Sequence, residues 1–183
     1  MATIVHGFDW PDRFVTGTLG QPGARTFYLQ ARQGPQLVSV ALEKEQSAAL
    51  ADKIDEILDE LMARADNPFS IPPQAAHALI DTDPLDQPVD EQFRVGALSL
   101  GWDAATAQIV IEAFPPLEID PDRMDVAEDD PAEALIVRLP VGTARAFAQR
   151  TLEVVHAGRP ACPLCGVPMD SDDHVCDLPD GFR

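Results

Sequence analysis

Alternating apolar and polar positions in the first half of the chain predict three short β-strands. The alternation covers residues 14–19, 26–32 and 37–42, and turn sequences rich in Gly and Pro separate the segments at 20–23 and 33–35. Short strands joined by tight turns pair with their neighbours in the chain. The pattern therefore predicts a three-stranded antiparallel meander.

A helix is predicted directly after this meander, over residues 44–65. Its apolar side chains recur with the helical period and define one stripe: Leu50, Ile54, Ile57, Leu58 and Leu61. The opposite side is rich in Asp and Glu, which is typical of a solvated helix surface. Asn67 and Pro68 end the helix.

The second half of the chain repeats this order of elements. Three segments correspond to the first half: 93–98 to 14–19, 109–113 to 27–31, and 134–139 to 37–42. A second helix is predicted over 141–156, with Pro140 near its start and Gly158 just after its end. The repetition indicates two βββα units that arose by an internal duplication.

These units predict an α+β fold, because the sheet of one unit is only partly covered by one helix and two units bury their sheets together. We expect a mainly antiparallel sheet domain of about six strands and two main helices, with residues 1–10 forming a further strand or arm. We expect a duplicated domain at 1–158, followed by a zinc-binding tail at 159–183. Within the duplicated domain, repeat one covers 8–66, an acidic, Pro-rich connection covers 67–91, and repeat two covers 92–158. Two acidic segments, 81–91 and 115–133, have no role that the sequence reveals.

The tail contains all three cysteines of the chain, Cys162, Cys165 and Cys176, and His174 stands two positions before the last of them. Three thiolates and one imidazole complete the tetrahedral shell that Zn²⁺ prefers. The sequence therefore predicts a small zinc knuckle. Because four protein ligands leave no open position, the expected role of the zinc is structural.

Two other interpretations of these cysteines remain open. One is a disulfide with a spare thiol, and the other is a redox-active Cys-x-x-Cys pair. A redox pair of the thioredoxin kind opens a helix, whereas Pro163, Gly166 and Pro168 are incompatible with a regular helix here. The zinc interpretation is favoured for that reason.

Composition narrows the classes of function. The formal net charge is −18 and the pI is about 4.3, so general binding to a nucleic acid backbone is disfavoured. No apolar run reaches the roughly 18 residues that span a membrane, and the N-terminus lacks the pattern of a signal peptide. An odd number of cysteines argues against a secreted disulfide framework. We therefore expect a cytoplasmic protein.

Candidate chemistry outside the tail is limited to one group of cations. No catalytic nucleophile motif, phosphate-binding loop or metalloprotease motif occurs in the chain. Four cations fall within the first 44 residues and form a candidate site for an anionic ligand: Arg13, Arg25, Arg32 and Lys44. The alternative is that they pair with Asp12 and the acidic loops.

Several segments together resemble a known family. They are residues 11–14, 20–23, 25–31 and 38–44, and the terminal motif in which Cys162, Cys165 and Gly166 are followed by His174 and Cys176. The chain is similar over nearly its whole length to an actinobacterial family classed as a domain of unknown function, whose members are sometimes automatically named repair proteins. The resemblance implies membership of that family and assigns no catalytic residue. In this chain Asp177, Leu178 and Pro179 follow the motif, where relatives are expected to have Pro-Arg.

The leading functional hypothesis is a non-enzymatic, zinc-containing module that binds another protein. A second hypothesis is an enzyme or binder of a phosphorylated or otherwise anionic small molecule, which the four cations would hold. A nucleic-acid-linked repair factor is the weakest of the three, because the tail itself is acidic.

Overall fold

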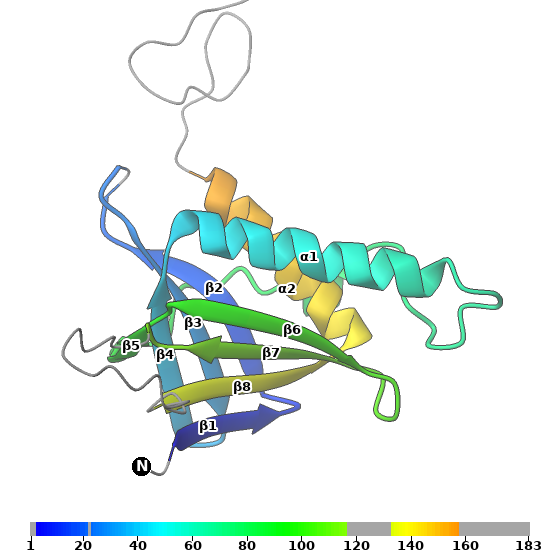
Figure 1. Ribbon diagram of the computed structural model, residues 1–183. Coiled ribbons are helices and arrows are strands. Elements are labelled where there is room, and N and C mark those ends of the chain that lie inside the picture. The colour runs from blue at the N-terminus through cyan, green and yellow to red at the C-terminus, as the bar shows by residue number, and fades with distance from the viewer. Residues whose placement is uncertain (1–2, 22, 117–132, 158–183) are drawn as a thin grey trace, which may run out of the picture.

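In the part of the chain that the computed structural model describes, residues 3–21, 23–116 and 133–157, eight strands form two four-stranded sheets (Figure 1). The elements in chain order are β1 (Ile4–Asp9), β2 (Arg13–Leu19), β3 (Thr26–Gln33), β4 (Gln36–Leu42), α1 (Lys44–Met62), the 3₁₀-helix η1 (His77–Leu79), β5 (Glu91–Arg94), β6 (Ala97–Asp103), β7 (Gln108–Phe114), β8 (Glu133–Pro140) and α2 (Val141–His156). The predicted α+β class with two main helices is confirmed.

Each sheet combines an antiparallel meander with one parallel strand from elsewhere in the chain. Sheet A has the strand order β1-β8-β7-β6, and sheet B has the order β2-β3-β4-β5. The added strands are β1, which pairs in parallel with β8, and β5, which pairs in parallel with β4. β1 falls in residues 1–10, where a further strand or arm was expected, whereas β5 was not expected as a separate strand. Pairing between distant segments leaves no local pattern in the sequence.

The two sheets face each other around one hydrophobic core. Side chains from both sheets and both helices belong to the same buried cluster, for example Leu29, Val40, Ile111, Val137 and Leu58. The strands of sheet A cross the front of the view, those of sheet B lie behind them, and α1 and α2 lie along the top (Figure 1). The helices therefore cover one side of the space between the sheets.

Both helices follow their predicted patterns closely. A capping box between Glu43 and Gln46 starts α1, and the helix ends at Met62, slightly before the predicted end. The chain leaves the helical path there because Asp66 and Asn67 adopt left-handed backbone conformations, with φ of 65° and 40°. The bounds of α2 are those that the sequence predicted.

The two meanders share one internal register. Gly17 on β2 pairs with Tyr28, and Gly101, at the same position of β6, pairs with Val110. The segments 27–31 and 109–113 occupy equivalent ladder positions, as do 37–42 and 134–139.

The helices extend this correspondence. From α1 at residue 44 to α2 at residue 141 the offset is 97 residues, and the same offset relates five buried positions of the two helices. In α1 they are Ser47, Leu50, Ala51, Ile54 and Leu58, and in α2 they are Ala144, Phe147, Ala148, Thr151 and Val155.

One predicted correspondence is wrong. Residues 93–98 do not form a single strand equivalent to 14–19, because β5 ends at Arg94 and β6 begins at Ala97. The chain turns at Gly96, where an added Cβ would lie 2.5 Å from the Cα atom of Pro116. The register instead makes β6 the counterpart of β2, so Gly101 and not Gly96 corresponds to Gly17.

Candidate functional site

A buried charge cluster joins β2, α2 and the connection that follows α1. Arg13 on β2 binds Asp81 through Nε and Nη2, at 2.6 and 2.9 Å from the two carboxylate oxygens. Arg150 on α2 binds the same carboxylate through Nη1 at 2.7 Å. Both arginine side chains are only 8% exposed. One aspartate therefore neutralises part of the charge of two buried guanidinium groups.

The remaining donors of the two arginines hold the backbone of the connection. Arg13 donates to the carbonyls of Asp83 and Pro84, each at 2.9 Å, and Arg150 donates to those of Asp81 and Asp83. Arg150 also donates to the carbonyl of Thr16, on the edge strand of sheet B, at 3.1 Å. Planar guanidinium groups with several fixed donors suit this kind of site.

The electrostatics of the cluster stabilise the ionised carboxylate. The hydrogen bond from Arg13 lowers the pKa of Asp81 below its ordinary value, against the opposing effect of burial. Burial lowers the pKa of Arg150, and the Asp81 charge acts in the opposite direction. Guanidinium groups stay charged in proteins, so the cluster is an ion pair at neutral pH.

After Asp81 the connection crosses the outer face of sheet B, which we define as the side turned away from sheet A: Arg13, Val15, Gly17, Gln30, Arg32 and Ser39. The side chain of Leu85 fills the space over Gly17, where an added Cβ would lie 2.5 Å from the Leu85 Cδ2 atom. Gln30 binds the backbone of Asp86 twice, accepting from its N–H at 2.7 Å and donating to its carbonyl at 3.1 Å. The connection at 81–86 is thus a fitted cover for this face.

The structure brings two of the four predicted anion-binding residues together. Arg32 binds Asp86 at 2.9 Å, and Nη1 of Arg13 lies 3.2 Å from the other oxygen of the same carboxylate. Arg25 precedes β3, at the opposite end from Arg32, which corresponds to roughly 23 Å along an extended strand. Arg25 donates to the carbonyl of Ala157 at 2.6 Å, and Lys44 is the first residue of α1.

Two buried arginines of α2 were not predicted as site residues. Arg150 belongs to the cluster described above, and Arg145 binds Asp55 and Asp59 of α1, each at 2.7 Å. These aspartates lie on the helix face that was expected to be solvated. A signal was present in the sequence, since two arginines occur within one short helix of a chain that has few basic residues.

The outer face of sheet A lacks the cover that sheet B has in the described residues. We define this face as the side turned away from sheet B, and its central residues are Gly7, Ser99, Gly101, Val110, Glu112 and Ile136. Gly7 and Ser99 are exposed and the other four are half-buried, whereas Val15, Gly17, Gln30 and Ser39 of sheet B are all buried. Gln108 and Ala134, which lie nearer the strand ends on the same side of sheet A, are also buried. An added Cβ at Gly101 would meet only the Val110 Cβ, at 3.8 Å, which is ordinary contact with a strand neighbour.

Three exposed apolar side chains lie on β1 or directly after it. Ile4, Val5 and Trp10 are 56%, 54% and 63% exposed, and of these Val5 has the strand parity of Gly7 on the open face. The backbone of Trp10 is left-handed, with φ of 54°, which is unfavourable for a large side chain. Trp10 is therefore a strained, exposed aromatic residue outside the hydrophobic core.

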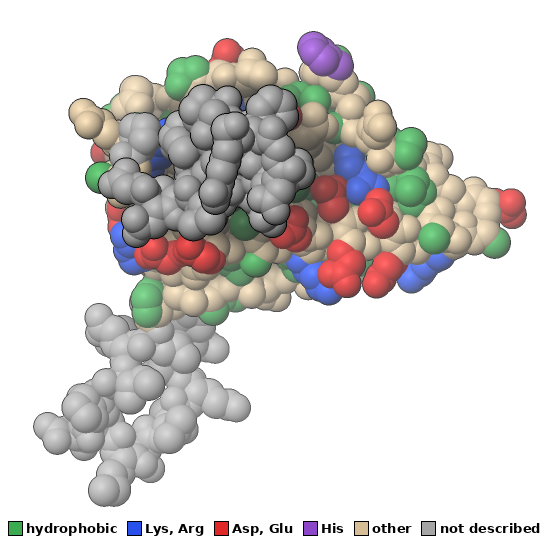
Figure 2. Space-filling view, turned by 90° about the horizontal axis from the view of Figure 1, so that it is seen from above, with side chains coloured by type: hydrophobic (Ala, Val, Ile, Leu, Met, Phe, Trp, Pro, Cys, Tyr) green, Lys and Arg blue, Asp and Glu red, His purple; other side chains and the backbone are tan. Residues whose placement is uncertain are grey.

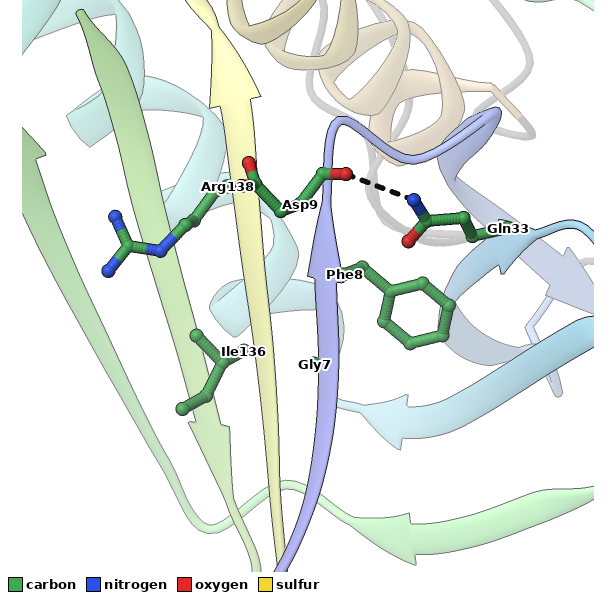
Figure 3. A pocket seen from close by; sticks show the side chains of 6 residues that line it. All are labelled: Gly7, Phe8, Asp9, Gln33, Ile136 and Arg138. Atoms are coloured by element: carbon green, nitrogen blue, oxygen red, sulfur yellow. Dashed lines mark hydrogen bonds between the residues drawn. The ribbon is translucent and has the colours of Figure 1, made fainter. Parts of the chain in front are cut away.

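A shallow pocket of about 330 Å³ lies at β1, next to the open face. Figure 3 shows Ile136 and Arg138 on one side of β1 and Phe8 and Gln33 on the other. Gln33 donates to the carbonyl of Asp9 at 3.1 Å, and Arg138 pairs with Asp103 at 2.9 Å. The polar groups of this pocket are bonded within the chain.

The described residues contain no group of three or more His, Cys, Asp and Glu side chains placed to hold a metal ion. The predicted zinc ligands Cys162, Cys165, His174 and Cys176 lie outside those residues. On the helix side, the coloured side chains show Asp and Glu mixed with Lys and Arg and no broad basic patch (Figure 2).

Together, the fold and this site define an α+β protein with two facing sheets. Within residues 3–21, 23–116 and 133–157, the chain covers the outer face of sheet B and leaves that of sheet A uncovered at its centre. The chain belongs to the family whose model is described as "Protein of unknown function (DUF3090)", which matches residues 6–176. This match confirms the family resemblance drawn from the sequence. No curated protein and no solved structure matches the chain. Within the described segments, no helix has the length and apolar character needed to cross a membrane.

Proposed function

We propose that this protein is a non-enzymatic interaction module, an adaptor that binds another protein and carries a structural zinc ion. The observation behind the proposal is the difference between the two outer faces. The chain covers the face of sheet B with its own residues 81–86, and the equivalent positions of sheet A are exposed or half-buried. This surface combines aliphatic side chains, Val110 and Ile136, with the polar Ser99 and Glu112, and a mixed surface of this kind supports association with another protein.

The alternative hypothesis of an anionic small-molecule site has less support. Arg13 and Arg32, the two predicted cations that converge, are bound to Asp81 and Asp86 of the same chain. A ligand phosphate would have to displace these carboxylates. Arg25 and Lys44 lie away from the pair and do not complete a clamp with it.

We include a structural zinc ion in the proposal because of the chemistry of its predicted ligands, Cys162, Cys165, His174 and Cys176. Three thiolates and one imidazole match the ligand set of closed tetrahedral zinc sites, so the ion would order its segment without binding substrate. We expect about one zinc per chain in protein purified under reducing conditions, measured by elemental analysis. Cys162→Ser should abolish stoichiometric zinc and move the melting temperature of the main domain by less than about 2 °C. Metal-free wild-type protein would contradict the assignment.

We also propose that the scaffold arose by duplication of one βββα unit. The shared register of the meanders and the constant offset between the buried positions of the helices support this origin. Each unit lends an edge strand to the other's sheet, β1 to sheet A and β5 to sheet B. Co-expressed fragments 1–89 and 90–183 should therefore copurify as a one-to-one complex. Fragments that fold separately without association would argue against the exchange.

The proposed function is tested by capture of a partner. The full-length tagged chain, with zinc bound, should retain one specific protein at near-stoichiometric amounts from an extract of its own source organism. The purified chain should show no turnover of phosphoesters. Reproducible turnover that disappears in a variant of this chain, together with the lack of any retained protein, would replace the adaptor by an enzyme.

A further inference from the structure

The covered face of sheet B shows how an extended segment docks on this scaffold. An aliphatic side chain, Leu85, occupies the space that Gly17 leaves on the sheet. A polar side chain on the neighbouring strand, Gln30, binds the backbone of the next residue of the segment. Ion pairs hold the segment at both ends, where Asp81 binds Arg13 and Arg150, and Asp86 binds Arg32.

Sheet A has the same frame at its outer face. Gly101 holds the ladder position of Gly17, and among the described residues an added Cβ there meets the Val110 Cβ, at 3.8 Å, in place of a leucine. Glu112 holds the position of Gln30, and Ile136 holds that of Ser39. The glycine gap and a hydrogen-bonding side chain beside it are therefore both present.

The charge of sheet A's face is opposite to that of sheet B. The positions of Arg13 and Arg32 are taken by Ala97 and Phe114, and a carboxylate, Glu112, replaces the neutral amide of Gln30. Asp9 and Asp103 are further acidic residues at the rim, and Arg138 is already paired with Asp103. A segment that docks here therefore meets an acidic surface, on a chain with a net charge of −18.

This charge decides between the possible occupants. The residues after α2 contain five aspartates, Asp170, Asp172, Asp173, Asp177 and Asp180, against Arg159 and Arg183. Like charges oppose docking of this acidic segment, and they also oppose association with a second copy of the chain. A cationic partner segment is attracted electrostatically to this face, whereas the acidic C-terminal segment and a second copy of the chain are repelled by it.

We propose that the outer face of sheet A binds an extended, Lys- or Arg-rich segment of a partner protein, with an aliphatic side chain seated over Gly101 and Glu112 as the polar contact. This inference rests on the proposed function and adds the chemical class of the partner. The exposed apolar residue Val5 of β1, on the same side as Gly7, extends the docking surface at its edge. The mode is the one that residues 81–86 use on sheet B, with the charges reversed.

The direct test uses synthetic peptides derived from residues 80–88. The probe carries Asp81→Lys, Asp83→Lys and Asp86→Lys, and its controls are the unchanged acidic peptide and the Lys peptide with Leu85→Ser. Binding to the full-length, zinc-loaded chain is followed by amide chemical shifts in NMR. We expect shifts at Gly101, Val110 and Glu112, and affinity about tenfold lower for each control peptide.

Two protein variants identify the contact. Gly101→Val fills the space for the anchor and should weaken binding of the Lys peptide by about tenfold. Glu112→Gln introduces the side chain found on sheet B and should reduce the preference for the Lys peptide over the acidic one by about fivefold. A Lys peptide that shifts no residue of this face, or whose affinity is unaffected by Gly101→Val, overturns the proposal.

The other occupants give distinct results in the same experiment. If a chelator that removes the metal shifts the Gly101 and Val110 resonances of the free chain, the face belongs to the chain's own C-terminal segment. If these resonances move with protein concentration, it belongs to a second copy. Either result overturns the proposal. A partner that is captured equally well by wild-type and Gly101→Val protein overturns this inference alone and leaves the proposed function standing.

Discussion

The outer faces of sheets A and B share one geometry and differ in what lies on them. Gly17 and Gly101 hold the same position in equivalent ladders, yet Leu85 packs over the first and no segment of the described residues packs over the second. A glycine in a strand leaves space on the face of a sheet, and the segment that packs over the glycine determines what fills that space. On sheet B that segment belongs to the chain, and on sheet A we assign it to a partner.

The two faces also differ in charge, which explains why the cover lies where it does. In a chain with 31 acidic and 13 basic residues, an acidic connection docks only where arginines are gathered. Arg13, Arg32 and Arg150 provide this on sheet B, where they bind Asp81 and Asp86. Sheet A has no such group of arginines among its described outer residues.

The largest effect is expected from Asp81→Asn. This change leaves the buried guanidinium group of Arg150 without its paired carboxylate, and it leaves Arg13 with Asp86 alone, 3.2 Å from its Nη1 atom. Uncompensated buried charge is costly, so we expect the free energy of unfolding in urea to fall by about 3 kcal/mol at pH 7. A loss below about 1 kcal/mol would show that the connection is not anchored by this cluster.

The same variant has a defined pH dependence. The pKa of Asp81 is lowered in the folded protein from an ordinary value of 3.8, so its contribution is complete above that pH and is lost as the pH falls through the folded value. The stability difference between wild type and Asp81→Asn should therefore be constant from pH 5 to 7 and shrink below about pH 3.8. A difference that grows on acidification would contradict this assignment.

A smaller effect is expected from Leu85→Ala. The Leu85 side chain is 5% exposed, but it lies on a surface segment that can settle onto the sheet after truncation. We therefore expect a loss of about 2 kcal/mol, at the low end for buried leucines, in the same urea measurement. Leu79→Ala is the matched control, since Leu79 is 48% exposed and its truncation should change stability by less than about 0.5 kcal/mol.

Local patterns in the sequence predicted both helices and five of the six meander strands. The sixth, β6, was misplaced, because the expected strand at 93–98 joined the end of β5 to the start of β6. The stripe of α1 and the bounds of α2 follow from helical periodicity, and the meander strands follow from alternation and turns. β5 could not be found in this way, because its four residues are ordered by parallel pairing with a strand about fifty positions earlier. The false match between 93–98 and 14–19 shows the same limit. The two segments share Phe, Gly and Leu at the same spacing, but the chain turns at Gly96 and divides the second segment between β5 and β6.

The candidate site was less predictable than the fold. The sequence identified Arg13 and Arg32 only as members of a group of four cations with Arg25 and Lys44, and it allowed acidic loops as their partners. It did not identify Asp81 and Asp86 among the many aspartates, or Arg150, because these groups meet only after distant segments pack. The exposure of the outer face of sheet A could not be predicted for the same reason, since the exposure of Gly101 depends on which segments pack over it in the folded chain.

The comparison between the two faces is tested most directly by one pair of matched substitutions, Gly17→Val and Gly101→Val, measured by urea unfolding. Valine at position 17 has to displace Leu85, and we expect a loss of about 2 kcal/mol. Valine at position 101 enters open space on a strand, and we expect stability to stay within about 0.5 kcal/mol of wild type or to rise. Equal losses from both substitutions would show that the face of sheet A is covered as well, and would contradict the account.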